Sequence, residues 1–214
     1  LRIASLDIGG GTSDLAINDF VLTNPEEKDA PFLDKKYVFA DGVYKAGDDI
    51  VKKVIEKVVL KKFIETANNK LEVKEKLQRY FGENAPSAEK SSRLEVLNGL
   101  LLPLTYFYFL CMEKNKDESF RHLFSECETL NKFNSILADN KIPQIEEKCF
   151  DYLESKDICT RAEFAQYFTS VPDMNELENA VQEVLMPIFL SYSRILDAWL
   201  KFANNRSIWP IALE

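Results

Sequence analysis

The stretch DIGGGTSD, residues 7–14, decides how the first part of this chain folds. It holds three of the chain's seven glycines, and these glycines lie between two apolar segments with β-branched residues, 2–8 and 14–22. Two such segments joined by a tight glycine-rich connection are typical of a β-hairpin. The sequence therefore predicts two antiparallel strands that meet at Gly9–Thr12.

The residue types in this turn suit a phosphate and its cation. Adjacent glycines serve where the backbone takes a positive φ or where another group approaches closely, and successive N–H groups can then bind a phosphate. Asp7 and Asp14 would repel a bare phosphate, whereas Mg²⁺ prefers carboxylate oxygens beside substrate phosphates. The pattern therefore predicts a magnesium–phosphate site made by Asp7, Gly9, Gly10, Gly11, Thr12 and Asp14. A glycine-rich hairpin without a ligand is the plain alternative.

Two other phosphate-binding motifs do not fit this turn. A Walker A loop requires a Lys followed by Ser or Thr after its last glycine, and no Lys follows here. A dinucleotide fingerprint opens a helix, but this turn leads into a second strand.

The segments that follow change from strand to helical periodicity. Residues 23–35 are a polar loop, and residues 36–44 favour another strand, with Asp41-Gly42 as a turn or bulge. From Asp48 to Ile64 apolar residues recur at helical spacing. A second helix is expected over residues 70–81 and should stop at Gly82.

After Pro86 the strand signals vanish, so we expect an almost wholly helical region. Capping boxes are predicted at Ser92-x-x-Glu95 and Thr160-x-x-Glu163. One long helix, interrupted or kinked at Pro187, is indicated by apolar residues in steps of three, four and seven. These residues are Leu177, Val181, Val184, Ile188, Ile195, Trp199 and Phe202.

The composition is that of a soluble globular protein, with 46% hydrophobic and 29% charged residues. The net charge of −8 argues against a general binder of nucleic acid or anionic membranes, which needs clustered Lys and Arg. The longest apolar run, 99–112, is too short to span a bilayer, and no signal peptide is visible. We therefore expect no nucleic-acid partner and no membrane span.

The cysteines predict a reduced, cytoplasmic protein. Cys111, Cys127, Cys149 and Cys159 form no C-x-x-C pair, and His122 is the only histidine, so a His/Cys zinc site is not expected. His122 itself is interpreted as a helix-surface or partly buried residue.

DIGGGTSD resembles the second phosphate-binding motif of the actin-like ATPase superfamily, which includes actin, heat-shock chaperones, bacterial actin homologues and sugar kinases. AGDDIVKKVI, residues 46–55, is similar to that family's next motif, which implies that Gly47 lies on the adenosine side of a nucleotide. The resemblance covers about residues 1–80. Within the superfamily, the start of the chain looks most like the large, virulence-associated SrfB-type bacterial proteins.

This resemblance implies an α+β or α/β fold. A small sheet, the head of an actin-like (ribonuclease H-like) lobe, would occupy residues 1–66, and a large helical subdomain residues 67–214. The chain opens on Leu1, and the first phosphate loop and the later adenosine motif of a complete member are not in it. We therefore expect a second-lobe piece of a longer protein, holding one wall of a nucleotide cleft.

The resemblance also implies roles for single residues in a protein that binds Mg-ATP and hydrolyses it with water. Asp7 and Thr12 would be catalytic, and Asp7 and Asp14 would hold the metal. The nucleotide contacts would be Gly9, Gly10, Gly11, Thr12 and Gly47. A helical interaction scaffold or inactive pseudo-ATPase, with its protein partner on residues 86–205, and a sugar or acid kinase are the alternatives. The isolated piece would be inactive, because the cleft needs both lobes.

Overall fold

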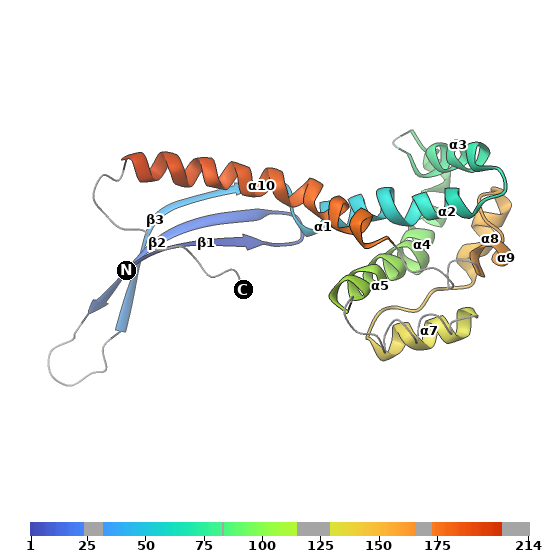
Figure 1. Ribbon diagram of the computed structural model, residues 1–214, viewed down its shortest axis with the longest axis horizontal. Coiled ribbons are helices and arrows are strands. Elements are labelled where there is room, and N and C mark those ends of the chain that lie inside the picture. The colour runs from blue at the N-terminus through green and yellow to red at the C-terminus, as the bar shows by residue number, and fades with distance from the viewer. Residues whose placement is uncertain (24–31, 83, 115–128, 166–172, 203–214) are drawn as a thin grey trace. The chain divides into compact units, whose positions relative to one another are not determined.

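A computed structural model of the protein describes residues 1–23, 32–82, 84–114, 129–165 and 173–202 (Figure 1). The chain divides into two compact units. Residues 1–50 and the chain from residue 182 form the first, called here the sheet unit, and residues 51–181 form the second, the helical unit. The expected boundary at residue 66 followed chain order, whereas the units follow spatial contact and place the end of the last helix with the sheet.

The sheet has three antiparallel strands in the order β1-β2-β3. β1 is Arg2–Ile8, β2 is Ser13–Thr23 and β3 is Phe32–Val43. The predicted hairpin of β1 and β2 is confirmed, and its register sets Asp7 opposite Asp14.

The third strand differs from its prediction in two ways. β3 begins at Phe32, four residues before the predicted start, while residues 24–31 of the predicted loop lie outside the described residues. The prediction of a turn or bulge at Asp41-Gly42 is wrong, because Gly42 pairs with Asp14 within the β-ladder. The register irregularity lies between Ile17 and Asn18 instead. Glycine is compatible with a strand interior where another group approaches closely.

One face of the sheet is covered by the last helix, α10 (Met174–Phe202) (Figure 1). Alternate strand residues face this helix, which puts Leu15 into a buried cluster with Val184, Ile188 and Tyr192. The predicted long helix is confirmed, but it is not interrupted at Pro187, which lies inside it. The side chains of Trp199 and Phe202 lie outside the described residues.

The predicted change to helical structure at Asp48 is confirmed. α1 (Gly47–Val54), the π-helical turn η1 (Ile55–Val59) and α2 (Leu60–Thr66) follow one another without a break. α3 covers Lys70–Phe81, as predicted, and Gly82 follows it. A methyl group at position 82 would stand 2.3 Å from the carbonyl oxygen of Gln78, so only glycine fits at this helix end.

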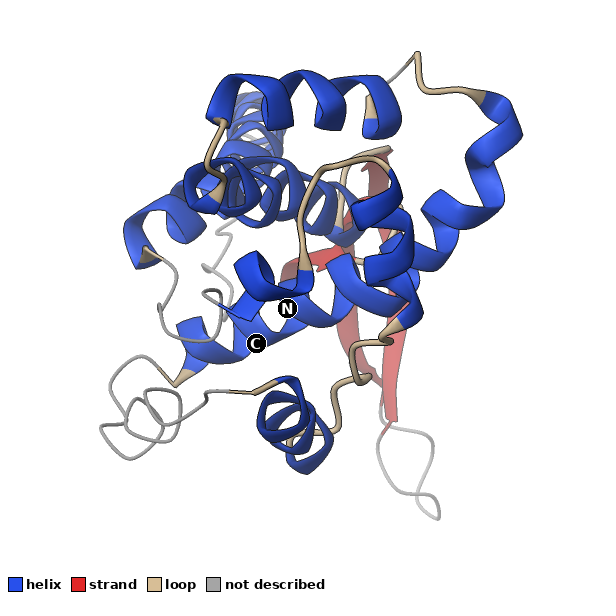
Figure 2. Cartoon of the chain, turned by 90° about the vertical axis from the view of Figure 1, so that its right-hand side faces the viewer, coloured by secondary structure: helices blue, strands red, loops and turns tan. Residues whose placement is uncertain are grey.

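The rest of the helical unit contains no strand among its described residues, as predicted (Figure 2). Its elements are η2 (Ser87–Glu89), α4 (Lys90–Val96), the π-helical turn η3 (Leu97–Leu101), α5 (Leu102–Glu113), α7 (Leu130–Asp139), α8 (Lys148–Ser155) and α9 (Arg161–Ala165). The capping box at Thr160 is confirmed by reciprocal bonds with Glu163. The one predicted at Ser92 is wrong, because Ser92 lies inside α4, which follows η2 directly.

The helix from Ser87 to Glu113 is long and apolar enough to cross a membrane by length and composition alone. However, 56% of its most apolar window is buried within the structure. Phe107, for example, packs edge-on against Phe133, with ring centroids 4.8 Å apart. Because the core helix of a folded unit has these same properties, the segment is only weak support for a membrane span.

Candidate functional site

The glycine turn is attached by its backbone to the start of α1. The N–H of Gly9 donates to the carbonyl oxygen of Thr12 at 2.8 Å and closes the turn. The N–H of Gly47 donates to Gly9 O at 2.8 Å, and that of Asp48 donates to Gly10 O at 2.7 Å. The two motifs singled out in the sequence, DIGGGTSD and AGDD, are therefore in direct contact within the sheet unit.

Close approach explains the glycine at positions 9 and 47, and unusual backbone angles do not. All seven glycines lie in the described part of the chain, and none of them has a positive φ. A methyl group at Gly47 would stand only 3.1 Å from Gly9 O. A methyl group at Gly11 would meet nothing within 4 Å, so that side of the turn is open.

The turn presents backbone donors. Among the residues that the structure describes, no acceptor forms a hydrogen bond with the N–H of Gly10 or of Gly11, and both residues are exposed. The N–H of Gly9, which was also predicted to bind phosphate, is occupied by the oxygen of Thr12. Two neighbouring donors in an exposed turn are the kind of group that anions bind.

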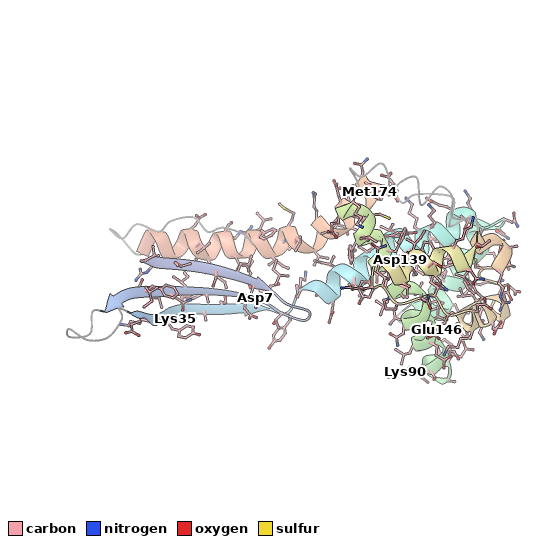
Figure 3. The ribbon with its side chains drawn as sticks, turned by 90° about the horizontal axis from the view of Figure 1, so that it is seen from below. Asp7, Lys35, Lys90, Asp139, Glu146 and Met174 are labelled. Atoms are coloured by element: carbon pink, nitrogen blue, oxygen red, sulfur yellow. The ribbon has the colours of Figure 1, made fainter. Side chains whose placement is uncertain are left out.

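Two carboxylates flank this turn. Asp7 is the second-to-last residue of β1 and Asp14 is the second residue of β2, and the two pair directly across the strands with exposed side chains. Asp7 is labelled in Figure 3. Like charges placed opposite each other on a sheet are destabilising. No Lys or Arg in the described ranges forms an ion pair with either residue. Asp14 accepts one hydrogen bond, from the Thr12 hydroxyl to Oδ2 at 3.1 Å.

Gly42 is a site residue that the sequence reasoning missed. It lies opposite Asp14 on β3, and a methyl group there would stand 2.5 Å from Asp14 Oδ1. Because residue 42 has no side chain, the Asp14 carboxylate can occupy this space. A glycine in a predicted strand, directly across from a motif aspartate, was the available signal.

Ser13 ties the site to the core of the sheet unit. It is fully buried, and its hydroxyl donates to Lys45 O at 2.6 Å. Its carbonyl oxygen accepts a hydrogen bond from the hydroxyl of Tyr192 on α10. Burial raises the pKa of Tyr192, so this hydroxyl remains protonated and able to donate at neutral pH. Nothing in the local sequence pattern indicated this pair.

The side chains at this site are better suited to a magnesium ion that carries a phosphate than to a metal ion bound by protein ligands alone. Within the described ranges, no group of three or more His, Cys, Asp or Glu side chains is arranged to hold a metal ion. Asp7 and Asp14 supply two carboxylates, and Mg²⁺ is commonly held by one or two carboxylates with water and substrate phosphates. The pair therefore fits a cation that arrives with its anion.

The described cysteines do not form a second reactive site. Cys111, Cys149 and Cys159 are free and buried. Burial raises the pKa of Cys111 and of Cys159 to about 12, and that of Cys149 to about 11. Such thiols carry almost no thiolate at neutral pH. Cys127 and His122 lie outside the described residues.

A sequence profile of the virulence factor SrfB family matches residues 1–181. The chain belongs to the SrfB family. Comparison with curated proteins and with solved structures gives no match. The predicted likeness to SrfB-type proteins is thus confirmed, while membership of the actin-like ATPase superfamily stays a prediction. In this SrfB family chain the matched region contains the glycine turn, the acid pair and Gly42, and it ends before Tyr192.

Proposed function

We propose that the glycine turn and the acid pair of this SrfB family chain form one wall of a Mg-ATP site. The observation that carries the proposal is the pairing of Asp7 with Asp14, two exposed carboxylates without an ion-pair partner among the described residues. They flank the turn that carries the N–H groups of Gly10 and Gly11, which form no hydrogen bond in the described part of the chain. The carboxylates would bind the Mg²⁺ ion of the ligand, and the backbone N–H groups would bind its phosphate.

Ligand binding would compensate for an electrostatic cost that the free protein bears. Placing like charges directly opposite each other costs roughly 0.2–1 kcal/mol of folding stability. A divalent cation removes this repulsion, and its bound phosphate accepts the free backbone hydrogen bonds. The arrangement is therefore less favourable in the free protein than with the ligand bound, as expected of a binding site.

Each residue has a distinct task in this proposal. Asp7 and Asp14 would hold Mg²⁺ directly or through water, and Gly10 and Gly11 would donate to phosphate oxygens. Bound Mg²⁺ would neutralise charge on the phosphates. The Thr12 hydroxyl donates its single proton to Asp14 in the free protein and would turn it toward the γ-phosphate when the nucleotide binds. Asp7 would orient the attacking water.

In this proposal Gly9 and Gly47 receive a part different from the nucleotide contact that the resemblance implies. Their backbone groups bond to each other and dock the turn on α1, so we assign them to the shape of the site. ATP, as opposed to another nucleotide, rests on the resemblance to actin-like ATPases alone.

The decisive experiment measures ATP binding to the full-length protein by calorimetry, with and without Mg²⁺, together with phosphate release. We expect Mg²⁺-dependent binding that falls at least about tenfold in Asp14→Asn, a loss of about 1.4 kcal/mol. Asp34→Asn is the matched control. Asp34 is also an exposed aspartate of the sheet, but it lies on β3 and pairs with Val21, away from the turn.

Two outcomes would change the conclusion. If the full-length protein shows no Mg²⁺-dependent ATP binding, the proposal is wrong and the interaction scaffold becomes the better explanation. If ATP binds but no phosphate is released, the protein is a pseudo-ATPase, or a kinase that needs its acceptor.

A further inference from the structure

We infer that Tyr192 on α10 is a positioning residue for this site, holding the acid pair and the glycine turn in place from the opposite face of the sheet. The inference rests on the proposed function for its consequence on ligand binding. Its structural basis, a hydrogen bond across the core of the sheet unit, can be tested independently.

The hydroxyl of Tyr192 donates to the carbonyl oxygen of Ser13, the residue between Thr12 and Asp14. Side chains alternate along a strand, so Ser13 points toward the buried face while Asp14 points to the other. The peptide group that follows Ser13 therefore controls the direction of the Asp14 side chain. Fixing its carbonyl oxygen restrains the direction in which the Cα–Cβ bond of Asp14 leaves the far face.

A second bond makes Ser13 a junction of three elements. Its hydroxyl donates to Lys45 O, two residues before Gly47, whose N–H in turn donates to Gly9 O. β2, the entry to α1 and the turn are thereby joined, and Tyr192 adds α10 to this set. A shift of α10 along the sheet would be passed to the turn through one buried hydrogen bond.

The surroundings of Tyr192 restrict its ring. The residue is only 3% exposed and packs with Leu15, Val184 and Ile188. Phenylalanine would fill the same volume, so packing alone does not require the hydroxyl. The hydroxyl therefore serves to hold Ser13 in position, by donating a hydrogen bond to its buried carbonyl oxygen.

The test compares Tyr192→Phe with Ile188→Val in the full-length protein. Both variants alter the same apolar cluster, but only the first removes the bond to Ser13. Hydrogen exchange of the peptide covering residues 9–14 should be faster in Tyr192→Phe and unchanged in Ile188→Val. The dissociation constant for Mg-ATP should rise up to about tenfold in Tyr192→Phe, the range of one neutral hydrogen bond.

A double variant identifies the route of the effect. If Tyr192 acts through Asp14, Tyr192→Phe should cost little further affinity in the Asp14→Asn background, because interacting residues are not additive. Equal exchange of residues 9–14 in Tyr192→Phe and in the control would overturn the inference. Faster exchange in a protein that does not bind ATP would support the positioning role and overturn the proposed function instead.

Discussion

Asp14 and Gly42 face each other on neighbouring strands, and the Asp14 carboxylate occupies the space that a side chain at position 42 would fill. A methyl group there would stand 2.5 Å from Oδ1. The atom in the way is the end of a mobile side chain, so it can move aside. The two residues thus link the shape of the sheet to the direction of a proposed metal ligand.

Gly42→Ala should weaken Mg²⁺-dependent ATP binding while leaving the fold nearly intact. The methyl group displaces the Asp14 carboxylate from its place beside β3, toward Asp7 on the other neighbouring strand, and so changes the geometry of the acid pair. The stability cost should stay below about 1 kcal/mol, because no backbone atom must move. Calorimetry and the melting temperature of the full-length protein measure both effects.

Gly82→Ala is the contrasting control. Its methyl group would stand 2.3 Å from the backbone oxygen of Gln78, which cannot turn aside. This variant should lose about 1–3 kcal/mol of stability, as overpacking typically does, with unchanged affinity for Mg-ATP. Unaltered binding in Gly42→Ala would show that Asp14 does not hold the metal.

Asp7→Asn should raise stability and lower activity together. Removing one charge of the pair with Asp14 relieves a repulsion worth up to about 1 kcal/mol. Removing a well-placed electrostatic contact at a reacting phosphate costs on the order of a hundredfold or more in rate. The melting temperature and the steady-state ATPase rate of the full-length variant test these opposite signs. Equal ATPase rates in variant and wild type would exclude a catalytic role for Asp7.

Gly99→Ala should destabilise the helical unit. A methyl group on this π-helical residue would stand 2.7 Å from Cys149 Sγ and 3.2 Å from Glu146 Cβ, and Glu146 N–H donates to Gly99 O at 2.9 Å. We expect a loss of about 1–3 kcal/mol, measured by denaturant unfolding. Cys149→Ala added to Gly99→Ala should restore part of this loss, because it removes the nearest obstructing atom. No recovery would place the strain at Glu146.

The buried thiols predict a loss of stability in alkali. Their pKa is raised by burial from an ordinary value of 9.0, so above about pH 9 the unfolded chain releases protons that the folded chain retains. Stability should be fully present below that pH and should fall as the pH rises further. Substituting Cys111 by Ala should flatten this fall.

Alkylation provides a second measure of the same burial. At neutral pH, Cys111, Cys149 and Cys159 should react with iodoacetamide only after unfolding. Peptide mapping by mass spectrometry identifies the modified residues. Rapid modification of any of the three in the native protein would contradict the burial described here.

The sequence alone was enough for the features that depend on neighbouring residues. The hairpin, the helix that follows Gly47 and the end of α3 at Gly82 each follow from a period or from a turn residue. The structure adds that Asp7 and Asp14 pair, because each lies two residues from the same four-residue turn in this hairpin. A chemical interpretation of the turn was therefore possible before its geometry was known.

Only the tertiary structure decided which distant residues support that turn. Tyr192 and Ser13 are 179 positions apart, and their hydrogen bond depends on how α10 packs on the sheet. Gly42 lies in a strand, where a turn was expected, and the space it leaves is filled by the side chain of Asp14 on the neighbouring strand. Local patterns report the preferences of a segment for helix, strand or turn. Contacts between remote segments arise from packing and from the satisfaction of buried polar groups, which no single segment encodes.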